Sequence, residues 1–139
     1  MTGMGVGKCG RLAGVSLVVD VFVYAADGSR GFLDVPEGVS DTAGFERWRT
    51  SVWGSPMLRS LGARFFPRLA EGDLYVEPDE IGAFLEECAL LVSHMPLIVA
   101  GMDSARGVEE RTYHVTSSLA HISHAARRAV QVGGGVVIW

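Results

Sequence analysis

The chain has 139 residues and a net charge of −4, and its apolar and charged fractions, 48% and 20%, are typical of soluble globular proteins. This composition excludes a largely disordered chain and a fibrous repeat. A chain of this length buries roughly two-thirds of the surface that it exposes when unfolded, which is enough for a hydrophobic core. We therefore expect one domain, 15–139, after a flexible leader, 1–14, that contains five glycines.

The cysteines and the apolar runs indicate the cellular compartment of the protein. Cys9 and Cys88 are too few for a disulfide framework, and we interpret both as free thiols in a reducing compartment. The longest apolar run, 12–26, is too short to cross a bilayer as a helix and is interrupted by Asp20. The sequence therefore predicts a cytoplasmic protein with no membrane partner.

The first predicted elements are strands. Apolar residues occupy both faces of the alternating pattern over 16–24, which is typical of a central strand. Asp27-Gly28 indicates a turn, after which 31–35 returns as a second strand.

Two helices and a strand are predicted next. Phe45, Trp48, Val52 and Trp53 have the spacing of an amphipathic helix that ends at 54–56. A short helix follows over 57–63, and 74–76 is a strand candidate.

Two long helices and a last strand complete the chain. Pro78 suits the first turn of a helix that ends before Pro96. Its apolar stripe is Ile81, Phe84, Leu85, Cys88, Leu91 and Val92. The second helix, 109–132, ends at a left-handed Gly133 cap. Its apolar stripe is Val115, Leu119, Ile122, Ala126, Ala129 and Val130. Because 136–139 forms a strand beside the first one, we expect an α+β fold with a small mixed or antiparallel sheet packed against two long amphipathic helices.

No catalytic motif is present, and no cofactor is expected. The G-x-G-x-x-G pattern at 5–10 precedes a strand, whereas a dinucleotide site needs a strand before the glycines and a helix after them. Burial would raise the pKa of Asp20 in a central strand, and Tyr24 lies on the same face. A small enzyme or ligand-binding protein with a pocket near these two residues is therefore one hypothesis.

The last helix carries three histidines. His114 and His121 lie on one flank of the helix, His124 lies within reach of His121, and two histidines three or four residues apart can supply part of a zinc site. No further ligand is identified, so we expect a solvated helix face and treat these residues as weak metal candidates.

Charge is strongly separated along the chain. Seven acids and no base lie within 71–87: Glu71, Asp73, Glu77, Asp79, Glu80, Glu86 and Glu87. Five arginines, interleaved with Trp48, Trp53, Phe65 and Phe66, lie within 45–70: Arg47, Arg49, Arg59, Arg64 and Arg68. An acidic lobe attracts a basic protein partner, whereas the Arg and aromatic segment 47–68 suits a nucleic-acid strand. Alternatively, the two segments pair with each other.

Three segments carry a resemblance: 65–67, 72–76 and 125–139. They look like segments of small bacterial proteins that resemble the immunity proteins of polymorphic toxin systems. The resemblance implies a small, acidic, cytoplasmic and non-catalytic protein, and it assigns no residue a role.

The leading hypothesis is therefore a non-enzymatic, immunity-like, protein-binding domain. Its seven acids, with Trp48 and Trp53 beside them, would neutralise a basic partner such as a toxin or effector. Nucleic acid is the less favoured partner, and self-association of the chain stays open.

Overall fold

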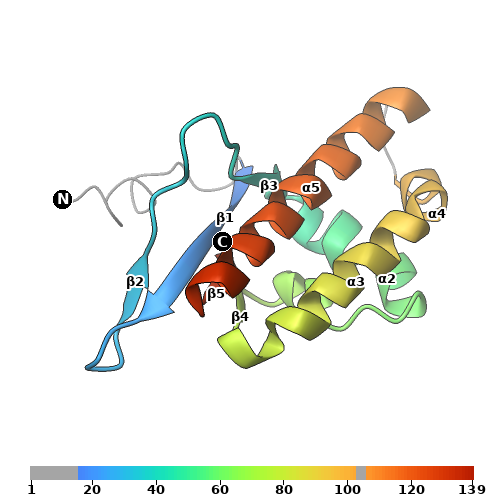
Figure 1. The fold of residues 1–139 in the computed structure, drawn as a ribbon. Helices are drawn as coiled ribbons and strands as arrows, with labels where there is room; N and C mark the ends of the chain where they lie inside the picture. Colours follow the sequence, from blue (N-terminus) through green and yellow to red (C-terminus); the bar gives the residue numbers. More distant parts are fainter. Residues whose placement is uncertain (1–15, 103–105) are drawn as a thin grey trace.

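An antiparallel sheet with helices on one of its faces forms the fold, which the computed structural model describes for residues 16–102 and 106–139 (Figure 1). The strands are β1 (Ser16–Tyr24), β2 (Arg30–Phe32), β3 (Thr42–Phe45), β4 (Leu74–Val76) and β5 (Gly135–Ile138). Four of them follow the order β2-β1-β5-β4, and β3 pairs separately with β1. All pairings are antiparallel, so the expected α+β class is confirmed. The expected leader, 1–14, lies outside the described residues.

Helices of very different length follow the first strands. The α-helices are α2 (Pro56–Ser60), α3 (Ile81–Ser93), α4 (Met95–Ala100) and α5 (Val108–Val132). A π-helical turn, η1 (Arg49–Trp53), and two 3-10 turns, η2 (Phe66–Ala70) and η3 (Pro78–Glu80), connect the other elements. The two longest helices, α3 and α5, lie side by side; α5 packs on β1, β3 and β5, and α3 packs along α5 (Figure 1).

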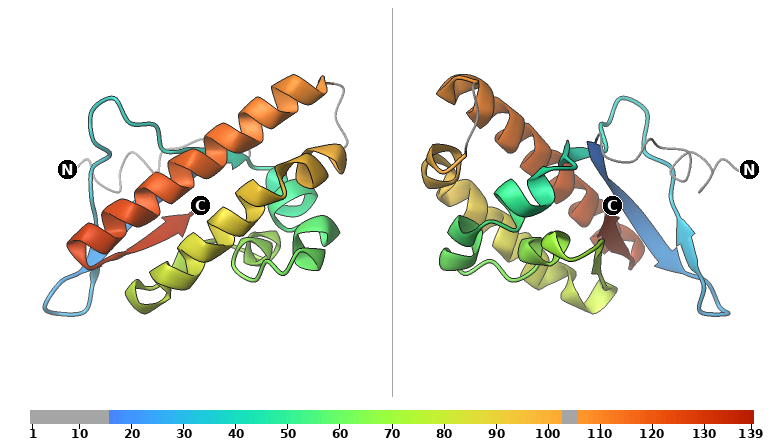
Figure 2. Two further views of the ribbon diagram at one scale, coloured as in Figure 1. Left: turned by 45° about the vertical axis from the view of Figure 1, so that its right-hand side comes forward. Right: turned by 180° about the vertical axis from the view of Figure 1, so that it is seen from behind.

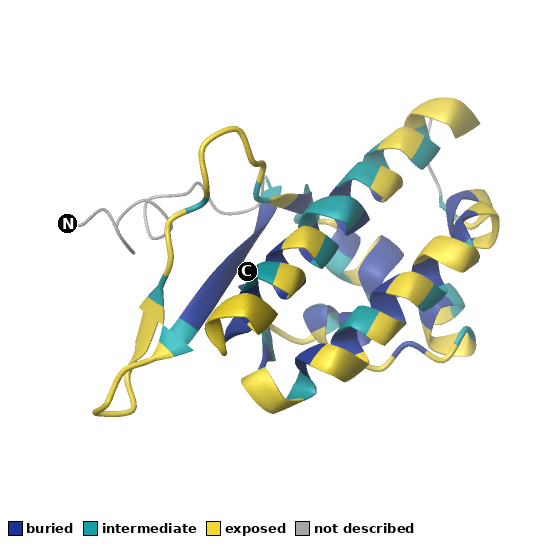
Figure 3. Ribbon diagram, in the orientation of Figure 1, coloured by how far each residue is buried: buried dark blue, intermediate teal, exposed yellow. Residues whose placement is uncertain are grey.

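The central position of β1 is confirmed, and it explains why both faces of this strand are apolar. β1 pairs with β2, β3 and β5, and Figure 3 shows it buried along most of its length. Leu17, Val19 and Val21 belong to the core beneath the helices, whereas Phe22 is buried on the opposite face. The predicted turn after β1 is also present, with Gly28 at φ 87°.

The end of α5 confirms the predicted glycine cap. Gly133 has φ 70°, and the two glycines after it permit close backbone approach. A Cβ on Gly134 would lie 2.0 Å from the carbonyl oxygen of Phe22, and one on Gly135 would lie 2.1 Å from that of Val76. The three glycines therefore let the chain leave the helix and enter the sheet between β1 and β4.

The apolar stripes of the long helices are confirmed except at their margins. Val92 and Val130 are 54% and 58% exposed, because their positions lie at the outer edge of the buried stripe on α3 and α5. The helix predicted from Pro78 begins as η3 and ends at Ser93, before Pro96. The sequence misses α4, in which Pro96 occupies the first turn, a position that needs no backbone N–H.

The helix predicted over 45–53 is wrong. Phe45 ends β3, where it pairs with Ser16, and only η1 is helical. The chain folds back because Gly44, at φ 105°, lets the Trp48 ring pack where a Cβ would lie 2.4 Å from it. The indole Nε1 of Trp53 then donates a hydrogen bond to the carbonyl of Ala43 at 3.0 Å. The apolar spacing in this segment therefore reflects a compact aromatic turn.

Glu87 is a buried carboxylate that holds a turn of the backbone. It is 7% exposed on α3, and its Oε1 accepts the backbone N–H of Arg64 at 2.7 Å. Its two oxygens also accept the N–H of Phe65 at 3.1 and 3.0 Å, and Oε2 accepts that of Phe66 at 2.9 Å. This one side chain therefore satisfies three backbone donors at the start of η2.

We expect Glu87→Ala to lower the free energy of unfolding by about 2–5 kcal/mol, because three buried or half-buried backbone donors lose their acceptor. Urea unfolding followed by circular dichroism measures the change. The matched control is Glu86→Ala, which removes an exposed carboxylate from the same helix and should change stability by less than about 0.5 kcal/mol. Equal losses in the two variants would contradict the anchoring role of Glu87.

Candidate functional site

The face of the sheet opposite α3 and α5 is crossed by no helix of the described residues (Figure 2, right). We call it the open face. Its side chains are Asp20, Phe22, Tyr24, Arg30, Phe32, Tyr75, Glu77 and Trp139. The strand register brings them together, since Phe22 lies opposite Phe32, and Val137 lies opposite both Asp20 and Tyr75.

Five aromatic rings form a connected layer on the open face. Phe22 is fully buried at its centre, with ring centroids 5.5 Å from Tyr24, 6.4 Å from Phe32 and 6.3 Å from Tyr75. The ring of Trp139 lies 5.1 Å from Phe32 and 6.3 Å from Tyr75. The other four rings are partly or largely exposed, so the layer covers the sheet and is itself in contact with solvent.

Arg30 is held at one end of this layer. Its guanidinium carbon lies 4.5 Å from the ring centroid of Tyr75, 5.1 Å from Phe22 and 5.5 Å from Tyr24. Its Nη2 also donates to Oε2 of Glu77 at 3.1 Å. The stacking and the ion pair together fix the orientation of the guanidinium group.

Tyr24 and Asp20, the two residues of the predicted pocket, share the open face but have different partners. The Tyr24 hydroxyl donates to Oε1 of Glu77 at 2.5 Å, and this hydrogen bond raises the pKa of the phenol. Asp20 is 2% exposed and accepts a hydrogen bond from Nε1 of Trp139 at 2.9 Å. Both groups therefore act here in packing and orientation.

The acidic segment does not form one continuous binding surface. Glu87 is buried and engaged by backbone, so its predicted contact with a partner is wrong. Asp73 pairs with Arg49 at 2.9 Å, and Glu77 and Glu80 form the capping box of η3. The remaining acids are exposed and have no ion-pair partner among the described residues: Glu71, Asp79 and Glu86.

The rings of the Arg and aromatic segment 47–68 are core residues. Trp48, Trp53, Phe65 and Phe66 are at most 5% exposed, so none of them can flank a partner or stack on a base. The predicted partner-binding role of Trp48 and Trp53 is therefore wrong. The predicted pairing of the two charged segments is present in one contact, Arg49 with Asp73.

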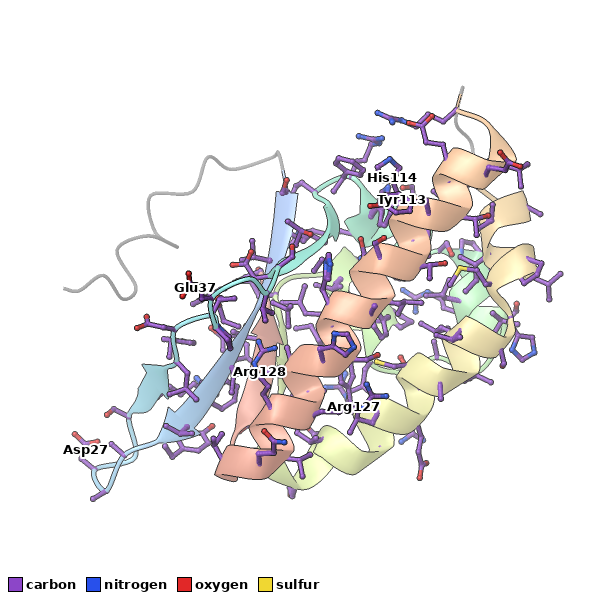
Figure 4. All side chains as sticks on the ribbon, turned by 45° about the horizontal axis from the view of Figure 1, so that its top comes forward. Asp27, Glu37, Tyr113, His114, Arg127 and Arg128 are labelled. Carbon is purple, nitrogen blue, oxygen red and sulfur yellow. The ribbon has the colours of Figure 1, made fainter. Side chains whose placement is uncertain are left out.

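The three histidines of α5 have separate environments. His114 lies beside Tyr113 on the N-terminal half of the helix, at the other end of α5 from Arg127 and Arg128 (Figure 4). The Nδ1 of His121 lies 2.8 Å from the carbonyl oxygen of Thr42, which ties α5 to β3, and His124 is exposed. In the part of the chain that the structure describes, no three His, Cys, Asp or Glu residues are grouped to hold a metal ion.

Comparisons with known proteins add no family: no protein-family model, no curated protein and no solved structure matches this chain. Within residues 16–102 and 106–139, no helix is long and apolar enough to span a bilayer.

Sequence reasoning identifies Asp20, Tyr24 and Glu77 as candidates but misses Arg30, Tyr75 and Trp139. Tyr75 could have been found from the alternating pattern around β4, because Asp73, Tyr75 and Glu77 occupy every second position and so lie on one face of an extended chain. The pairing of β4 with β5 places these residues beside β1, and no local pattern specifies that pairing.

The Cys88 thiol is buried beneath α5, and burial raises its pKa from an ordinary value near 9 to about 12. Between pH 9 and 12 the unfolded chain loses this proton while the folded chain keeps it, so stability falls as the pH rises through that window. We expect the difference in unfolding free energy between the parent and its Cys88→Ala variant to change in favour of the variant by about 1 kcal/mol from pH 9 to 10, because the unfolded thiol is half ionised at pH 9 and almost fully ionised at pH 10. Urea unfolding at both pH values, with Cys9→Ser in both proteins, measures this; a constant difference would contradict it.

Proposed function

We propose that this chain is a non-enzymatic protein-binding domain and that the open face is its binding surface. The observation that carries the proposal is the layer of partly exposed rings around Arg30, on a sheet face that no described helix covers. Tyrosine, tryptophan and arginine are the residues enriched at the energetic centres of protein interfaces. Because Arg30 and Tyr24 are already oriented by Glu77, little side-chain entropy is lost on binding.

A partner with a basic surface suits this face best. β4 is an edge strand, and acids occur just before it, at Glu71 and Asp73, and just after it, at Glu77 and Asp79. The chain as a whole carries a net charge of −4. Glu71 and Asp79, which flank this edge and have no ion-pair partner among the described residues, would repel a phosphate backbone and attract lysines and arginines of a protein.

Occlusion of such a basic surface is also the role that the resemblance to immunity proteins implies. The partner would be a toxin or effector met in the cytoplasm. No covalent chemistry is needed for this role, since covering the partner's basic surface is enough to block its access to substrate. The rings supply contact area, and the acids at the β4 edge supply orientation and association rate.

The test measures binding of the purified chain to the protein encoded by the neighbouring gene, by biolayer interferometry. Arg30→Gln and Tyr75→Ala should each weaken binding by about 30-fold or more, because each removes a contact at the centre of the face. The matched controls are Arg59→Gln and Tyr113→Ala, which change exposed residues of α2 and α5. Affinity should also fall between 50 and 300 mM salt, since opposite charges attract across the interface.

Three outcomes would overturn the proposal. The first is that the neighbouring gene product does not bind. The second is that the α2 and α5 controls weaken binding as much as the variants of the open face. The third is concentration-dependent sedimentation of the chain alone that Tyr75→Ala abolishes, because the open face would then join two copies of this chain.

A further inference from the structure

The hydrogen bonds between β1 and β2 fix which backbone groups of β2 face the sheet. The N–H of Leu33 donates to the carbonyl oxygen of Val21 at 2.9 Å, and the N–H of Ala25 donates to that of Ser29 at 2.8 Å. Every second residue of an antiparallel ladder directs its backbone groups to the same neighbour. Ser29, Gly31 and Leu33 therefore face β1.

The other edge of β2 is unpaired. Arg30 and Phe32 alternate with the residues that face β1, so their backbone N–H and C=O groups point away from the sheet. Among the described residues, no strand lies on that side of β2 and no hydrogen bond reaches these groups. Figure 1 shows β2 as the outermost strand, and Figure 3 shows that it is largely exposed. A strand edge of this kind readily pairs with another strand.

We propose that a second copy of this chain pairs with this edge, antiparallel to β2 and related to it by a two-fold axis. β2 is three residues long, and the two-fold arrangement that pairs all three with the β2 of the copy has its axis at Gly31. Arg30 then lies opposite Phe32 of the second copy, and both direct backbone groups to the shared edge. Because each copy uses the same residues, the interface closes at a dimer.

The side chains of β2 permit this approach. Gly31 has no side chain, and a Cβ built on it would meet only the carbonyl oxygen of Val23, at 3.9 Å. Arg30 is the one charged residue of β2, and in this register it lies opposite a ring instead of its own copy. Its charge is also balanced by Glu77 at 3.1 Å. No like charges are therefore opposed along the paired strands.

A hollow beside this edge suits the turn that precedes β2 in the second copy. Its volume is about 160 Å³, and Leu33, Asp34 and Arg128 are among its lining residues. Antiparallel pairing places the turn of the second copy next to this segment. That turn carries Asp27, whose pKa is lowered by hydrogen bonds from the hydroxyl and the N–H of Ser29. Arg128 has no ion-pair partner among the described residues, so Asp27 of the second copy supplies an opposite charge.

The first test is sedimentation velocity of the full chain, carrying Cys9→Ser, between about 1 and 500 µM, where we expect a monomer–dimer equilibrium. Gly31→Lys should raise the dissociation constant of the dimer by about fivefold or more, because two like charges then lie opposite each other at the axis. Gly31→Glu should have the same effect, and an equimolar mixture of the two variants should dimerise more tightly than either alone. The matched control, Gly31→Ala, should dimerise like the parent.

Disulfide cross-linking tests the register. At the axis, opposite residues have Cα atoms about 4.5 Å apart, which suits a disulfide. Gly31→Cys in the Cys9→Ser chain should therefore give a covalent dimer under mild oxidation. Leu33→Cys is the matched control, since it places an exposed thiol on the same edge but opposite Ser29 of the second copy.

The proposal is overturned if the parent stays monomeric up to about 500 µM, or if the mixture of Lys and Glu variants dimerises no better than each alone. It is also overturned if Leu33→Cys cross-links as readily as Gly31→Cys. Tyr75→Ala should dimerise like the parent, because Tyr75 lies on β4 at the opposite edge of the sheet. Loss of the dimer in this variant would overturn the proposal and assign self-association to the open face.

Discussion

The Glu87 carboxylate is the interaction on which the middle of this structure depends. A buried carboxyl group is unfavourable unless it is hydrogen-bonded, and here the N–H groups of Arg64, Phe65 and Phe66 meet that need. The turn that they form directs two rings into the core: Phe65 lies 5.5 Å from Phe84, and Phe66 stacks on Phe84 at 5.3 Å. Because η2 leads from this turn into β4, Glu87 also helps to position this edge strand.

The sheet meets a second constraint, since its central strand is apolar on both sides while the long helices cover only one. On the other side of the sheet, the aromatic rings of the open face cover the strand. They bury Phe22 completely, while Tyr75 and Trp139 remain partly exposed. A layer of this kind is rigid, because each ring is packed edge-on against a neighbour. The ring layer therefore has a structural reason to exist, since it shields the second apolar side of β1 from solvent.

The sequence predicts the structural features that depend on residues close together in the chain, and it does not predict those that depend on contacts between distant segments. The strand 16–24, the strand 74–76, the helix 109–132 and the Gly133 cap follow from periodicity and backbone preference within one segment, and the structure confirms them. The segment 45–53 fails because its aromatic spacing fits a helix as well as it fits a compact turn, and only Gly44 and tertiary packing decide between them. The site was predictable to the same extent: Asp20 and Tyr24 share one strand, and Arg30 lies opposite Tyr24 across the turn between β1 and β2. Tyr75 and Trp139 join them only through β5, which pairs with both β1 and β4 and follows β1 by more than one hundred residues.

The acidic and basic segments of the sequence do not form separate charged surfaces in the folded molecule. Several acids of 71–87 are engaged within the fold, Glu87 by backbone, Asp73 by Arg49 and Glu77 by Arg30 and Tyr24. The arginines divide as well, since Arg49 supports β4 while Arg47 turns toward a pocket beside α5. The ring-rich open face and the pocket that Arg47 lines are therefore built on different elements. Because folding pairs acids of 71–87 with Arg30 and Arg49, the charge separation seen along the sequence is partly cancelled in the folded molecule.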